Sequence, residues 1–170
     1  MRAYFLDRIR VFLTILVIAH HSAITYGASG NWFIKLSSAD GPSALALTLF
    51  VAINQAFFMG FFFLISGYLT PSSYDRKGSA SYLRDRLLRL GLPVLVFGFV
   101  LGPLTVAIAE SRNWDLGERW LELMAQFRFV MGPMWFACAL LVFSIAYVLW
   151  RRLVPIRPGP KRPIPGHLIW

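Results

Sequence analysis

Two neighbouring histidines, His20 and His21, end an apolar run that follows the charged stretch from Leu6 to Arg10. In an α-helix, with about 100° and about 1.5 Å per residue, Arg10 and His21 lie within roughly 20° of one face and roughly 16 Å apart along the axis. His20 lies on a different face. A histidine inside a long apolar segment is costly unless it is paired or lines a polar cavity. Both histidines are therefore candidate site residues, and the shared face favours His21.

Three roles are compatible with such a pair of imidazoles. Haem or metal ligation needs a partner ligand on a facing helix, but the third histidine, His167, lies near the end of the chain and no Cys/His cluster is present. Metal binding is therefore disfavoured. A structural role, with a neutral ring hydrogen-bonded to a neighbour, and acid/base catalysis on a hydroxyl group both remain open.

The composition places these residues in a membrane protein. Hydrophobic residues make up 57% of the chain, and the mean hydropathy is +0.59, well above the values of soluble domains. The net charge of +9 comes from basic clusters between apolar runs rather than from one polar domain, which argues against a nucleic-acid partner. The single cysteine, Cys138, excludes a disulfide within the chain.

The apolar runs predict an all-α polytopic membrane protein with about four spans. A cleaved signal peptide ending near Ala28-Ser29-Gly30 is disfavoured because further spans follow the first. The polar segments predict an external loop over 27–43, an amphipathic helical turn over 79–90, a surface helix over 116–129 and a basic, proline-rich tail over 151–170. The predicted spans cover residues 11–26, 44–69, 91–109 and 132–150.

The basic residues predict the orientation of these spans. With the amino terminus inside, the inner segments 1–10, 71–90 and 151–170 carry 13 of the 17 Lys and Arg residues, and the outer segments carry 4. The positive-inside rule therefore predicts that both termini are cytoplasmic.

Further polar residues could line a cavity or bind a ligand. Gln55 and Ser66 are eleven residues apart, so they share a helix face that we expect to point into the bundle. Hydrogen bonding between helices explains the pair equally well. Arg86 and Arg89 lie one turn apart on one side of a predicted helix, as either a topology signal or a pair that binds phosphate.

The order and spacing of four motifs resemble the acyltransferase 3 family of membrane acyltransferases, which has an Arg-x10-His signature. The likeness covers most of residues 5–150, which we predict to form one membrane domain. The motifs are Leu6-Asp7-x-Ile9-Arg10 with His21, the stretch from Phe61-Phe62-Phe63 to Ser66-Gly67-Tyr68-Leu69, Arg84-x-Arg86-x-x-Arg89-Leu90-x-x-Pro93, and Pro133-Met134-Trp135-Phe136.

The resemblance implies transfer of an acyl group, often acetyl, from cytoplasmic acyl-CoA to a hydroxyl of a carbohydrate or other envelope acceptor. His21 would be the catalytic imidazole, either as a base or as the carrier of the acyl group. Arg10, Arg86 and Arg89 would hold the donor's phosphates. We expect no tightly bound cofactor, metal or nucleic acid, and a multi-pass location in the inner membrane. Possible cavity-lining residues are His20, Gln55, Ser66 and Trp135.

One feature departs from this family. Its members typically have about ten spans, whereas this sequence predicts four, so we expect it to correspond to an amino-terminal portion of such an enzyme. The alternative function is a non-catalytic small membrane protein, either a truncated remnant or a transporter-like module.

Overall fold

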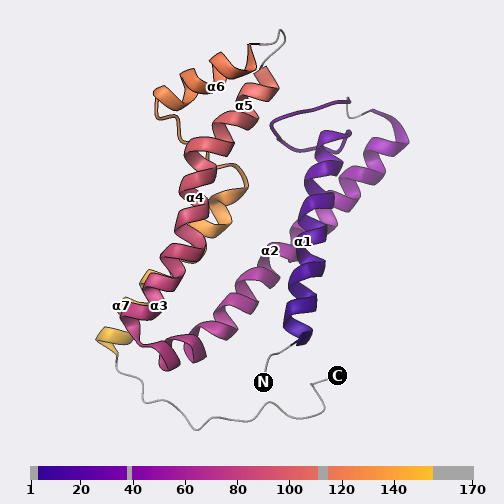
Figure 1. Ribbon diagram of the computed structural model, residues 1–170. Coiled ribbons are helices and arrows are strands. Elements are labelled where there is room, and N and C mark those ends of the chain that lie inside the picture. Colours follow the sequence, from indigo (N-terminus) through magenta and orange to yellow (C-terminus); the bar gives the residue numbers. More distant parts are fainter. Residues whose placement is uncertain (1–3, 38–39, 111–114, 155–170) are drawn as a thin grey trace. The chain divides into compact units, whose positions relative to one another are not determined.

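The computed structural model describes residues 4–37, 40–110 and 115–154, and every regular element in these ranges is helical (Figure 1). Four segments are long and apolar enough to cross a membrane: Tyr4–Thr25, Gly41–Lys77, Ser79–Glu110 and Gly132–Leu153. The predicted all-α fold with four spans is thereby confirmed. The elements are α1 (Tyr4–Thr25), α2 (Gly41–Lys77), α3 (Ser79–Arg86), α4 (Leu92–Val96), α5 (Gly102–Glu110), α6 (Leu116–Ala125) and α7 (Trp135–Leu153).

The helices extend beyond several predicted boundaries. Helix α2 continues through the charged residues to Lys77, so the expected connection after Pro71 is wrong in its first part. The predicted amphipathic turn from Ser79 is helical and runs without a break into the third span. Helix α6 occupies most of the predicted surface helix, and α7 continues to Leu153. Residues 155–170 of the predicted tail lie outside the described residues.

The chain divides into two compact units, and the division falls inside α2. Among the described residues, unit 1 ends at Tyr68 and unit 2 begins at Leu69. Pro71 follows this division and has no N–H to donate to the carbonyl of Gly67, four residues earlier. The hydrogen-bond ladder of α2 is therefore interrupted where one unit meets the next along the chain.

Unit 1 is a hairpin of α1 and the first part of α2, closed by the intervening loop (Figure 1). Buried Ala23, Ile24 and Ala28 pack against apolar residues of the loop and of α2, namely Trp32, Leu47, Phe50 and Val51. The loop backbone returns to the end of α1, where the Leu36 N–H donates to the Thr25 carbonyl at 2.9 Å. The end of α1, the loop and the first part of α2 thus share one apolar cluster.

The third span of the chain, in unit 2, contains two π-helical turns, η1 (Leu87–Gly91) and η2 (Phe97–Leu101). Each turn precedes a proline, Pro93 or Pro103, whose ring crowds the carbonyl four residues earlier and offers no N–H. Widening the helix to i→i+5 bonds relieves this crowding. In η2 the donor five residues after Gly98 would be Pro103, so the helix cannot satisfy the Gly98 carbonyl in this way.

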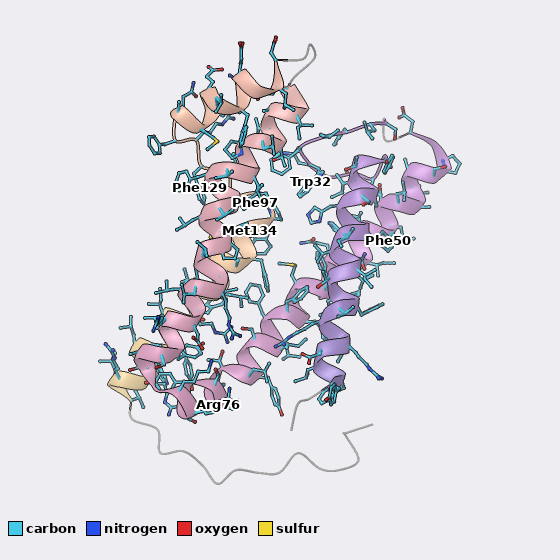
Figure 2. All side chains as sticks on the ribbon, viewed as in Figure 1. Trp32, Phe50, Arg76, Phe97, Phe129 and Met134 are labelled. Atoms are coloured by element: carbon cyan, nitrogen blue, oxygen red, sulfur yellow. The ribbon has the colours of Figure 1, made fainter. Side chains whose placement is uncertain are left out.

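Helix α6 and the segment after it donate hydrogen bonds to carbonyls of the third span. The Val130 N–H donates to the Gly98 carbonyl at 2.9 Å, and the Trp120 indole N–H donates to the Val100 carbonyl at 3.0 Å. Phe129 lies against Gly98 in the same part of unit 2 that holds Phe97 and Met134 (Figure 2). In the hydrocarbon layer an unmet carbonyl is expensive, so these bonds attach α6 and the segment after it to the third span.

Glycine at position 102 is required by this packing. A Cβ built there would lie 2.6 Å from Val130 Cβ and 3.0 Å from the Phe97 carbonyl oxygen. We expect Gly102→Ala to lower the free energy of unfolding by about 1–3 kcal/mol through overpacking. The measurement is a denaturant titration in mixed micelles.

Gly60→Ala is the matched control, because nothing lies within 4 Å of a Cβ at that helical position. Alanine there should raise stability by up to about 1 kcal/mol, as expected for a helix interior. If both variants unfold at the same denaturant concentration, the packing of Val130 on Gly102 is contradicted.

Candidate functional site

His21 is held in one orientation by its own helix. Its Nδ1 lies 2.8 Å from the Val17 carbonyl oxygen, one turn earlier in α1. A carbonyl can only accept, so Nδ1 carries the proton and the neutral ring keeps its lone pair on Nε2. The Trp32 ring of the loop packs against the imidazole with 4.0 Å between ring centroids. Half-buried His21 is thus an imidazole with a fixed tautomer and a basic nitrogen.

His20 has different surroundings, between the two helices of unit 1. It is buried, and its ring lies 5.2 Å from Phe58 of α2 and 5.3 Å from His21, measured between centroids. Its Nδ1 has no hydrogen-bond partner among the described residues, and the same is true of Nδ2 of buried Asn54. Each buried polar atom without a hydrogen-bond partner lowers the stability of the fold by about 1–3 kcal/mol. The presence of two such atoms in unit 1 therefore needs an explanation.

Arg10 and His21 lie on one continuous helix, α1. The helical period therefore fixes the position of Arg10 relative to His21. Its guanidinium is half-exposed and lies 3.4 Å from Asp7 Oδ1, one turn earlier. An exposed ion pair of this kind is worth only about 0–1 kcal/mol. The contact therefore leaves Arg10 able to exchange Asp7 for a stronger anion.

The two residues of the pair predicted on α2, Gln55 and Ser66, differ in solvent exposure. Ser66 is half-buried, whereas Gln55, expected to face inward, is exposed. The buried polar position on this part of α2 is instead the preceding residue, Asn54. A lining role for Gln55 and Ser66 stays a prediction.

The predicted arginine pair belongs to unit 2, and its two members differ. Arg86 is half-buried, with its guanidinium 5.2 Å from the Tyr82 ring centroid and 3.5 Å from Thr70 Oγ1. Arg89 is exposed and lies inside η1, where the wider π-turn changes its angular position relative to Arg86. The shared side of Arg86 and Arg89 and their donor-binding role stay predictions.

Tyr82 and Arg151 join the helices at this end of unit 2. The buried Tyr82 hydroxyl donates to Ser144 Oγ of α7 at 3.3 Å. Arg151 of α7 lies between two aromatic rings, 5.0 Å from the Tyr74 centroid and 5.8 Å from the Tyr147 centroid. It also donates to Asp75 Oδ1 at 2.7 Å. The charged end of α2 is thereby attached to α7.

Trp135, the remaining predicted residue, begins α7 directly after the short 3-10 turn η3 (Gly132–Met134) and is 45% exposed. Its ring meets the Phe136 ring edge to face at 6.3 Å. Across residues 4–37, 40–110 and 115–154, no three His, Cys, Asp or Glu side chains gather where they could hold a metal ion.

Sequence reasoning missed two residues beside the histidines. Trp32, which lies in the loop after α1 (Figure 2), contacts His21, and Asn54 is buried in the part of α2 that packs on α1. A lone tryptophan in a polar loop was the available signal for the first. For the second, the adjacent polar residue Gln55 drew attention to the wrong side of the helix.

Comparisons with known proteins now add to this geometry. A family model described as an acyltransferase domain matches residues 3–162. Glucans biosynthesis protein C of Salmonella gallinarum is 30% identical over 176 residues, which cover 98% of this chain and 44% of the relative. The protein of the same name from Escherichia coli K12 is 38% identical over 94 residues, which cover 55% of this chain and 23% of the relative.

These relatives are longer than the chain, which spans less than half the length of either one. No solved structure matches the chain. The family match covers nearly the whole sequence, including Arg10, His21 and all four candidate spans. The chain therefore belongs to the acyltransferase 3 family.

Proposed function

We propose that the chain is part of a membrane O-acyltransferase that moves an acyl group, acetyl by preference, from acyl-CoA to a hydroxyl of a carbohydrate or other envelope acceptor. Family membership supports an acyltransferase, and the relatives' name, glucans biosynthesis protein C, favours a carbohydrate acceptor. The observation that carries the proposal is the fixed tautomer of His21, whose Nδ1–H is bound to the Val17 carbonyl. A structural imidazole does not require a free Nε2, whereas a general base does.

The reaction follows from that orientation. Nε2 of His21 removes the proton from the acceptor hydroxyl, and the resulting oxygen nucleophile attacks the thioester carbonyl of the donor. The carbon–sulfur bond then breaks, and the imidazolium returns the proton to the leaving CoA thiolate. The products are an O-acyl ester and free CoA, with no net gain or loss of protons. Trp32, packed on the ring, helps to keep the imidazole in place.

Arginines would hold the donor in this scheme. Arg10, about three turns before His21 on the same helix, binds phosphate groups of acyl-CoA, a role suited to a permanently charged planar guanidinium. Arg86 and Arg89 of unit 2 are further candidates for binding phosphate groups. The distribution of basic residues favours both termini, and hence Arg10, on the cytoplasmic side of the inner membrane, where acyl-CoA is available.

A transfer assay tests the proposed function. Membranes that carry the chain are mixed with radiolabelled acetyl-CoA and a short glucan, and the glucan is recovered. We expect label that is released by mild alkali, as an O-ester is, and that is absent when membranes lack the chain. Glucan that stays unlabelled in both preparations would contradict the proposal.

The donor site is tested separately by Arg10→Ala. Loss of charge-assisted hydrogen bonds worth about 1.5–3 kcal/mol should weaken acetyl-CoA binding by about 10- to 100-fold. Arg8→Ala is the matched control, because Arg8 is an exposed neighbour in the same helix. Equal acetyl-CoA affinity of the two variants would show that Arg10 serves only as a topology signal.

A further inference from the structure

The proposed reaction does not use two buried polar side chains of unit 1, His20 and Asn54. His20 is 6% exposed and Asn54 is 3% exposed, and the unpartnered atoms are His20 Nδ1 and Asn54 Nδ2. Both residues lie in unit 1, one on α1 and one on α2. Buried polar groups in proteins nearly always have a partner, so a missing group is expected here.

The sequence order and the contacts of α2 with α1 indicate where Asn54 lies relative to His20. His20 contacts Phe58, and Asn54 precedes Phe58 by one helical turn, so both lie on the face of α2 that meets α1. One turn further along α1, Ala23 and Ile24 pack with residues of α2 that precede Asn54, including Phe50 and Val51. Along α2, Asn54 therefore lies between Phe58, which contacts His20, and Phe50 and Val51, which pack near the end of α1.

The chemistry of the two atoms selects the missing group. The Asn54 amide nitrogen can only donate, whereas Nδ1 of His20 accepts in one neutral tautomer and donates in the other. A hydroxyl both accepts and donates, so it satisfies Asn54 and the accepting form of His20 at once. Carboxylates and phosphates would bring a charge into a membrane-spanning helix pair at high cost.

The position of His20 beside His21 indicates which hydroxyl would bind to His20 and Asn54. The His20 and His21 rings meet edge to face with 5.3 Å between centroids. A hydroxyl held at His20 is therefore next to the one that gives its proton to His21. We infer that His20 and Asn54 bind a second, neighbouring hydroxyl of the acceptor, which makes a vicinal diol the preferred acceptor class. This inference rests on the proposed function, because it places the reacting hydroxyl at His21.

Equilibrium binding tests the inference without turnover. The full chain in detergent is titrated with laminaritriose, a short glucan, in a calorimeter. We expect Asn54→Leu and His20→Leu each to weaken binding about tenfold, the loss of one hydrogen bond to a buried partner. The double variant should bind no more weakly than the weaker single variant, because both side chains hold the same hydroxyl. Ala52→Leu, at an exposed position of α2, is the control.

A second measurement isolates the extra hydroxyl. In competition with laminaritriose, the wild-type chain should prefer trans-1,2-cyclohexanediol to cyclohexanol by about tenfold, and Asn54→Leu should remove this preference. Leucine has the same branched arrangement of heavy atoms as asparagine and leaves no unmet amide, so we expect the variant to fold.

The outcomes separate the two proposals. If Asn54→Leu keeps wild-type affinity and preference, or if the wild-type chain binds no laminaritriose, the inference is overturned and water satisfies the pair. If binding and preference behave as expected but no acyl transfer is seen, the diol site stands and only the proposed function fails.

Discussion

Replacing His21 with alanine is expected to lower the acyl-transfer rate by about 10²- to 10⁴-fold, the usual contribution of a positioned general base. The variant removes Nε2, the only ring nitrogen that the hydrogen bond from Nδ1 to Val17 leaves free to take a proton. Alanine is compatible with a helix interior, so α1 should remain intact. Transfer of labelled acetyl to a glucan is measured as the initial rate at saturating donor and acceptor.

Two further variants distinguish a catalytic role of His21 from a structural one. Ser22→Ala changes the exposed neighbour of His21 and should retain the wild-type rate. His21→Gln keeps a polar side chain of similar reach but cannot take up a proton, so it should be as slow as His21→Ala. A rate for His21→Ala within a few-fold of wild type would refute the catalytic assignment. A slow alanine variant with an active glutamine variant would instead indicate a purely structural imidazole.

The largest expected effect on stability comes from Arg151→Ala. The Arg151 side chain is 10% exposed and lies between the Tyr74 and Tyr147 rings, and it donates to Tyr147 Oη at 2.9 Å and to Asp75 at 2.7 Å. A fully buried ion pair that loses one member costs about 3–5 kcal/mol. Asp75 is 32% exposed and is partly hydrated after the change, so we expect a loss of about 2–3 kcal/mol.

Denaturant titration in mixed micelles measures this loss. Arg152→Ala is the matched control, because it removes the same charge from the next, exposed residue of α7. Arg151→Lys should recover part of the stability, since lysine can pair with Asp75 but cannot reproduce the planar contacts with both rings. Equal unfolding midpoints for Arg151→Ala and Arg152→Ala would show that the contacts do not hold α2 and α7 together.

The sequence was sufficient for features that depend on one helix. Long apolar runs predict the four spans, because the hydrocarbon layer demands about 20 apolar residues per crossing. The Arg10–His21 relationship needs only the period of α1, which is continuous from Tyr4 to Thr25. Pro93 and Pro103 can be read from the sequence as sites where the third span lacks backbone donors, but the π-turns that accommodate them cannot.

Features that depend on two segments could not be predicted in this way. Helix α2 is apolar on all sides, so its sequence does not reveal which of Asn54 and Gln55 faces α1. The answer depends on the register set by Ala23 and Ile24 against Phe50 and Val51. Similarly, Trp32 reaches His21 only because the loop closes back on α1, and loop conformation has no periodic signal.

The carbonyl of Gly98 has a consequence for the synthesis of the protein. Because Pro103 cannot supply its donor, this carbonyl is satisfied by the Val130 N–H, which belongs to a segment made after the third span. During translation the third span therefore exists for a time with a polar group that lipid cannot satisfy. We expect it to stay beside the insertion machinery until Val130 emerges, so that the third and fourth spans enter the bilayer as a pair.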